Sequence, residues 1–234
     1  MRNPPNAFEV AWEIFKKDVR IELRTREVIA TAGVFSVVVG FLASMAFHVD
    51  DRTNPSVAAG TIWITVFFAS VLSFGRIWQR ERDESALTGL LVAPIPRASI
   101  FLGKAMATFM MIVMIAIPLV LLCLFLFRID IGGADSREHD LALVGFLAMG
   151  SLSLSLIGTL FGAMTVRTRA RDLVLAIVLF PLLSPVLVCG VVGTRKAFEH
   201  QAFETYSGFL GLMGASVAIA LLFGVALFGT LLED

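Results

Sequence analysis

The sequence GRIWQRERDESALTGLLVAPIPRASIFLGK, residues 75–104, is the longest charged interruption between two apolar runs of this chain. It contains a dense charge cluster: Arg80, Glu81, Arg82, Asp83 and Glu84. Consecutive charges of this kind are stable only in water or among lipid headgroups. The stretch therefore predicts a surface segment that joins two apolar elements.

An apolar stripe follows the charge cluster. Leu87, Leu90 and Leu91 recur at helical spacing and define about one face of a short helix. Pro94 and Pro96 then end this helix, because proline lacks an amide donor and disfavours the helical conformation in the residue before it. Such a helix either docks into a partner or lies passively on the headgroups, and the pattern alone leaves both interpretations open.

The composition is that of a membrane protein. Of 234 residues, 57% are hydrophobic and 16% are charged, and the formal net charge is +0. This balance gives no electrostatic basis for nucleic acid binding. Cys123 and Cys189 both lie within apolar runs, which excludes a secreted disulfide framework but leaves a single bridge between them open.

Six apolar segments make up most of the chain. A helix needs ~20 residues, each rising ~1.5 Å, to cross a hydrocarbon core of ~30 Å, and each segment is at least that long. We predict an all-α membrane protein with six transmembrane helices in a domain of residues 28–234. The predicted spans are about 28–49, 56–75, 101–127, 141–166, 173–194 and 208–232.

An amphipathic helix is predicted before the first span, within an arm of residues 1–27. Its apolar positions recur every three to four residues among charged ones: Phe8, Trp12, Phe15, Val19 and Leu23. This pattern predicts a helix in the membrane interface, and packing on a partner is compatible with it. The arm is too charged for a cleavable signal peptide, so we expect the first span to act as an uncleaved anchor.

Lysine and arginine are unevenly distributed among the connections. The N-terminal arm has six, the second connection five and the fourth three, whereas the first, third and fifth connections together have five. Cytoplasmic connections are enriched in these residues. We therefore expect both termini, residues 76–104 and the turn at 167–171 to be cytoplasmic.

The predicted spans contain no Asp, Glu, Lys, Arg or His except at their edges. An ionisable group at the centre of a bilayer costs at least ~2.5–3.5 kcal/mol and usually serves ion or proton coupling. The pattern disfavours a transporter driven by protons or sodium. It also disfavours an intramembrane protease.

Small residues recur along the fourth span. They are Ser151, Ser155, Thr159 and Ala163 on one stripe, and Gly158 and Gly162 on the next. We interpret both stripes as packing positions, and a polar strip lining a substrate path is the alternative for the serines and threonine. Gly208, Gly211 and Gly214 predict a second close helix contact.

Three prolines interrupt the predicted spans. Pro118 lies in the third span, and Pro181 and Pro185 lie in the fifth. Each removes an amide donor and should kink its helix. Such kinks are hinges in some transporters and static bends in most membrane helices.

Motifs spread over residues 9–190 resemble the CcmB family, the haem exporter protein B family of cytochrome c maturation, whose members are ABC-2 type membrane subunits. The order Arg-Glu-Arg-Asp, Ala-Leu-Thr-Gly-Leu-Leu and Ala-Pro-x-Pro-Arg within residues 80–97 resembles the coupling segment of such subunits. Ser85 departs from the family pattern, which usually has glycine there. Further motifs are KDVRIELR (17–24), GR (75–76), FLGKA (101–105), RARD (169–172) and FPLLSP (180–185).

The resemblance implies a non-catalytic permease subunit of an ATP-driven complex in the bacterial inner membrane. ATP is expected on a separate CcmA-like ATPase subunit, since Gly103-Lys104-Ala105 lacks the other residues of a phosphate loop. We expect that subunit to hold the leucines in a groove with charges at its rim. The predicted coupling residues are Arg80, Glu81, Arg82, Leu87, Leu90, Leu91, Pro94 and Arg97.

The resemblance also implies further partners and a cargo. CcmC-like and CcmD-like membrane proteins, a haem chaperone similar to CcmE and a second membrane half are the expected partners. Haem is implied as cargo of the complex, either exported or released with its chaperone, and no cofactor is expected to bind this chain directly. A permease for a lipid, polysaccharide or drug, and a non-transporting scaffold for haem-delivery partners, are the alternatives.

Three histidines, His48, His139 and His200, are predicted at the outer face, where haem ligation is one interpretation. They are far apart in sequence and lack a Trp-rich loop. We therefore interpret them as polar loop residues.

Overall fold

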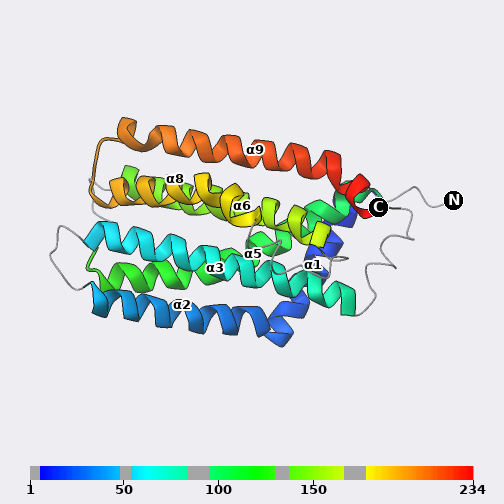
Figure 1. The fold of residues 1–234 in the computed structure, drawn as a ribbon, viewed down its shortest axis with the longest axis horizontal. Coiled ribbons are helices and arrows are strands. Elements are labelled where there is room, and N and C mark those ends of the chain that lie inside the picture. The colour runs from blue at the N-terminus through cyan, green and yellow to red at the C-terminus, as the bar shows by residue number, and fades with distance from the viewer. Residues whose placement is uncertain (1–5, 48–53, 84–94, 130–136, 166–177, 234) are drawn as a thin grey trace.

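The chain folds into an elongated bundle of helices (Figure 1). The computed structural model describes residues 6–47, 54–83, 95–129, 137–165 and 178–233. Within these ranges the regular elements are all helical. They are α1 (Ala7–Thr25), α2 (Glu27–Ala46), α3 (Asn54–Asp83), α5 (Arg97–Leu126), α6 (Arg137–Thr165), α8 (Phe180–Phe198) and α9 (Phe203–Glu233).

Five described helices are long and apolar enough to cross a membrane. They are α2, residues 54–75 of α3, α5, residues 137–163 of α6 and residues 203–229 of α9. These five coincide with the first, second, third, fourth and sixth predicted spans. The remaining prediction, 173–194, begins outside the described residues and continues in the shorter α8.

One end of the bundle carries α1 together with the end of α3, the start of α5 and the end of α9 (Figure 1). α3 does not stop where its apolar run ends. It continues to Asp83, past the predicted end of the second span at residue 75, so Arg80, Glu81 and Arg82 belong to its last turns. No proline occurs between residues 76 and 83, and a helix can therefore project beyond its apolar stretch.

α5 begins before the predicted start of the third span at residue 101, and the short helix that Pro94 and Pro96 were predicted to end lies outside the described residues. Pro96 is the N-cap residue, in an extended conformation with φ −61° and ψ 128°, and Arg97 is the first helical residue. Pro118 lies inside α5 and Pro185 inside α8. Pro181 lies in the first turn of α8, where a missing amide donor costs least, and the part of the predicted fifth span before residue 178 lies outside the described residues.

Aromatic side chains fill the bundle where glycines leave room for them. The indole of Trp63 on α3 lies between α6 and α8, because a Cβ atom on Gly150 or Gly190 would come within 2.1 or 2.4 Å of its ring. Its Nε1 donates a buried 2.9 Å hydrogen bond to Thr194 Oγ1. Phe74 occupies the corresponding space beside Gly158.

The serine and threonine stripe of α6 is buried: Ser151, Ser155 and Thr159 are each at most 1% exposed. The predicted contact at Gly208, Gly211 and Gly214 is different. No atom of the described chain lies within 4 Å of a Cβ built on any of these three glycines, so they make no close helix contact within it.

Candidate functional site

The helix α1 packs on the first turns of α5 with a face that the sequence analysis did not single out. Its buried residues, Ala11, Ile14, Asp18 and Glu22, recur every three to four positions. The predicted apolar stripe faces away: Phe8 is 71% exposed, and Trp12 and Leu23 are exposed as well. The predicted amphipathic helix is therefore present. Its aliphatic and acidic residues pack on the bundle, and the aromatic residues Phe8 and Trp12 are exposed on its outer side.

A glycine brings the two helices together. A Cβ atom added to Gly103 of α5 would lie 2.6 Å from the carbonyl oxygen of Ala11 and 2.8 Å from Cβ of Ile14. Real Cβ atoms do not approach so closely, so any larger residue at position 103 must displace the backbone of α1. The close approach requires glycine for its lack of a side chain.

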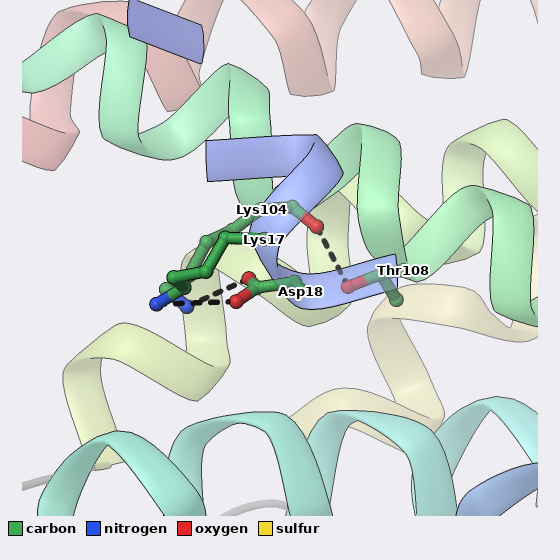
Figure 2. A network of polar contacts seen from close by, with 4 residues as sticks. All are labelled: Lys17, Asp18, Lys104 and Thr108. Carbon is green, nitrogen blue, oxygen red and sulfur yellow. Dashed lines mark hydrogen bonds and ion pairs between the residues drawn. The ribbon is translucent and has the colours of Figure 1, made fainter. Parts of the chain in front are cut away.

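Directly after this glycine, Lys104 forms a buried ion pair with α1. Its Nζ lies 3.0 Å from Oδ2 of Asp18, and the two residues are only 0% and 7% exposed. The second carboxylate oxygen, Oδ1, lies 3.2 Å from Nζ of the partly exposed Lys17. Figure 2 shows both ammonium groups converging on the one carboxylate, with the Thr108 hydroxyl donating a 2.9 Å hydrogen bond to the Lys104 carbonyl.

The cost of burying two charges makes this ion pair selective for its own partners. Two charges removed from water lose their hydration, and only close, well-oriented partners offset that loss. The carboxylate with two lysines around it provides such partners. A buried pair adds little to net stability, but removing one member leaves an uncompensated charge, which costs about 3–5 kcal/mol.

A second carboxylate on the same face of α1 fixes the turn into α2. Oε1 of Glu22 accepts hydrogen bonds from the amides of Val28 and Ile29, at 2.7 and 3.1 Å. These amides belong to the first turn of α2, which has no intrahelical acceptors for them. Arg26 between the helices has a left-handed backbone with φ 54°. α1 is therefore held at both of its neighbours, α5 and α2.

The predicted coupling residues lie at the ends of α3 and α5 or outside the described residues. Leu87, Leu90, Leu91 and Pro94 fall outside the described residues. Arg80, Glu81 and Arg82 are in the last turns of α3, and Arg97 begins α5. Lys104 follows Arg97 by seven residues, or about 10 Å along a helix. The structure therefore describes α3, which leads into the predicted coupling segment, and α5, which follows it. α5 is joined to α1 by the ion pair of Lys104 and Asp18.

The pairing of Lys104 with Asp18 was not predicted from the sequence. The two residues are 86 positions apart, and each occurs in a motif of the family resemblance, 17–24 and 101–105. A signal was present: Asp18 has Ala11 and Ile14 at helical spacing before it, and Lys104 follows a glycine inside an otherwise apolar run. The structure brings these motifs together.

The opposite end of the bundle corrects the interpretation of the histidines. His139 and His200 lie with ring centroids 5.0 Å apart, and Nδ1 of His139 is 3.1 Å from the hydroxyl of Tyr206. Phe203 and Phe146 contact the Tyr206 ring, so aromatic neighbours are present as well. His48 lies outside the described residues. His139 therefore lies in the first turn of α6 and not in a loop, whereas His200 is an exposed residue of the connection between α8 and α9.

Two other site predictions have structural outcomes. Cys123 and Cys189 are buried free thiols, so the bridge left open by the sequence is not formed. Within the described ranges, no group of three or more His, Cys, Asp or Glu side chains is arranged to hold a metal ion.

Five described helices that are long and apolar enough to cross a bilayer define the class: a polytopic α-helical membrane protein. The CcmB protein family matches residues 9–228, and this chain belongs to that family. The match includes most of α1, with Asp18, at one end and most of α9 at the other.

Relatives of similar length carry one name. Heme exporter protein B of Rhodobacter capsulatus is 26% identical over 208 residues, which cover 88% of this chain and 92% of the relative. The protein of that name from Escherichia coli K12 is 26% identical over 207 residues, covering 88% and 91%. Heme exporter protein B of Pseudomonas aeruginosa is 24% identical over 211 residues, covering 89% of each chain.

Proposed function

We propose that this chain is the membrane subunit of an ABC transporter complex for cytochrome c biogenesis. Membership of the CcmB family and the shared name of its relatives support a role in haem export. In this proposal the chain crosses the bacterial inner membrane six times in the ABC-2 arrangement, with α8 as the fifth span. The distribution of lysine and arginine supports cytoplasmic termini.

ATP hydrolysis is assigned to a CcmA-like partner subunit, and this chain receives its mechanical signal. The partner holds Leu87, Leu90 and Leu91, with Glu81, Arg82 and Arg97 at the rim. Buried apolar anchors supply most of the energy of such an interface, and rim charges set its register.

The buried pair of Asp18 and Lys104 is the observation that carries this mechanism. The coupling segment leads directly into α5, and the first turns of α5 are joined to α1 by the ion pair and by the contact at Gly103. A displacement at Arg97 therefore moves α5 and α1 together, because packed helices behave as rigid units. The exposed side chains Phe8 and Trp12 of α1 lie in the membrane interface and fix the depth of α1 in the membrane.

The work done by the complex is export of haem or release of a haem-loaded chaperone of the CcmE type. The interior of the described bundle favours release, since Trp63, Phe74 and Phe146 fill the space beside its glycines. CcmC-like and CcmD-like proteins and a second membrane half complete the proposed assembly.

Assay of c-type cytochromes in a strain lacking this gene tests the proposal. We expect covalent haem staining of c-type cytochromes to disappear and to return with the wild-type gene. Normal staining would contradict the proposal and favour a permease for another substrate. Full rescue by a variant that binds the ATPase but no longer stimulates it would favour a scaffold.

A further inference from the structure

We infer that His139 and His200 form a binding site for a divalent transition-metal ion at the end of the bundle opposite α1. This site does not depend on the proposed function. Its side chains come from two segments, the first turn of α6 and the connection between α8 and α9, and Tyr206 at the start of α9 contacts one of them.

The separation of the two rings fits a shared ion. Their centroids are 5.0 Å apart and their planes are inclined by 81°. Two imidazoles bound to one tetrahedral ion through bonds of ~2.0–2.1 Å have centroids roughly 5 Å apart. On opposite sides of a haem iron, the same bond lengths would place the centroids roughly 6 Å apart with the porphyrin between them. The observed pair therefore fits a free ion better than a haem.

The surroundings of His139 match those of a metal ligand. A ligating histidine usually makes a hydrogen bond through its other ring nitrogen, which fixes the orientation of the ring. Nδ1 of His139 has this bond, to the hydroxyl of the fully buried Tyr206, and this leaves Nε2 for an ion. His139 is half-buried and His200 is exposed, so the pair is accessible from solution.

Charges among the described residues at this end of the bundle balance, since four carboxylates (Glu138, Asp140, Glu199, Glu204) stand beside four cations (Arg128, Arg137, Arg195, Lys196), so the imidazole ligands and not the local charge must select the ion. Glu138, Asp140 and Glu204 lie in the first turns of α6 and α9. Of the nearby cations, Arg195 pairs with Glu199 at 3.6 Å and Lys196 donates a hydrogen bond to the Thr205 carbonyl. Imidazole ligands select the Zn²⁺, Cu²⁺ and Ni²⁺ class of ions. With two protein ligands, water or a bound partner supplies the other positions.

The backbone conformation at His200 suits glycine, so a variant that lacks this histidine should still fold. His200 has φ 52°, and its amide and that of Gln201 bond back to the carbonyls of Ala197 and Lys196, both at 3.1 Å. Glycine is the usual residue at this position of a helix end. The substitution His200→Gly therefore removes a ligand while it suits the turn.

Equilibrium dialysis of the purified full-length protein, carrying no polyhistidine tag, against Zn²⁺ tests the site. We expect one zinc ion per chain, with affinity lowered at least about tenfold in His200→Gly and His139→Gln, because each removes a direct ligand and even loss of a ligand's hydrogen-bond partner costs that much. Gln201→Ala is the matched control and should bind as the wild type does. The melting temperature of His200→Gly in chelator should equal or exceed that of the wild type.

Two outcomes would overturn the inference. One is zinc binding that both histidine variants retain unchanged, which would place the ion elsewhere. The other is a wild-type protein that binds no zinc at submillimolar concentrations. A haemin absorbance change that His200→Gly abolishes, in a chain that binds no zinc, would assign the pair to haem iron instead.

Discussion

Nζ of Lys104 lies 3.0 Å from Oδ2 of Asp18, in a place where solvent reaches almost none of either residue. This contact joins the N-terminal helix α1 to α5, the helix that follows the proposed coupling segment. A lysine in an apolar span usually extends its ammonium group to the headgroups. Here the ammonium group meets a carboxylate from α1, and α1 is thereby fixed to the bundle.

Removing either charge of this pair should destabilise the protein. In Asp18→Ala, the buried Lys104 loses its carboxylate, and we expect the free energy of unfolding to fall by about 3–5 kcal/mol. The melting temperature of the purified protein in detergent measures this. Lys17→Ala is the matched control and should have a small effect, since Lys17 is partly exposed.

A double replacement separates stability from function. Asp18→Leu with Lys104→Met puts an apolar pair in the same space, and stability should return to near the wild-type value. If the pair only connects α1 to α5, cytochrome maturation should return with it. A stable double variant that fails in maturation would show that the charges have a further role.

The contact at Gly103 should be sensitive to a single methyl group. We expect Gly103→Ala to destabilise the protein by about 1–3 kcal/mol, because its Cβ would overlap the Ala11 carbonyl and α1 must shift. Gly33→Ala is the matched control, since no atom lies within 4 Å of its added Cβ. Equal melting temperatures for the two variants would contradict the close packing of α1 on α5.

The indole of Trp63 should make position 190 equally sensitive to an added methyl group. Gly190→Ala would bring a Cβ within 2.4 Å of the ring, and we expect a loss of about 1–3 kcal/mol. Combining it with Trp63→Leu should recover part of that loss by giving the methyl group room. A double-mutant cycle on melting temperatures measures the coupling, and strictly additive effects would argue against the contact.

Gly211→Ala tests the exposed side of α9. No atom of the described chain lies within 4 Å of its added Cβ, so stability of the isolated chain should not change. A loss of stability only in the assembled complex would indicate that a partner packs on this glycine.

The length and apolarity of α2, α3, α5, α6 and α9 made them predictable from sequence, because a span must satisfy its backbone inside the bilayer. The face of α1 that packs on the bundle was harder to predict. In a soluble helix the aromatic stripe of Phe8 and Trp12 would point inward. Near a membrane the aromatic stripe can face lipid, and the packing face then contains Ala11, Ile14 and Asp18.

The pairing of residues far apart in sequence could not be derived from spacing. Asp18 and Lys104, or His139 and His200, meet only because the helices fold back on one another. Helical periodicity shows which residues share a face of one helix, but it does not show which other helix packs on that face. The position of Trp63 between Gly150 and Gly190 was hidden for the same reason.

The most direct test of the proposed coupling is ATP hydrolysis by the proposed CcmA-like ATPase subunit, with this chain reconstituted beside it in lipid nanodiscs. We predict that Leu87→Asp with Leu90→Asp abolishes the stimulation of hydrolysis while the protein remains inserted, because charged side chains cannot fill an apolar groove. Ser85→Gly in the same segment should retain stimulation. Unchanged stimulation and co-purification in the double aspartate variant would contradict the coupling role of this segment.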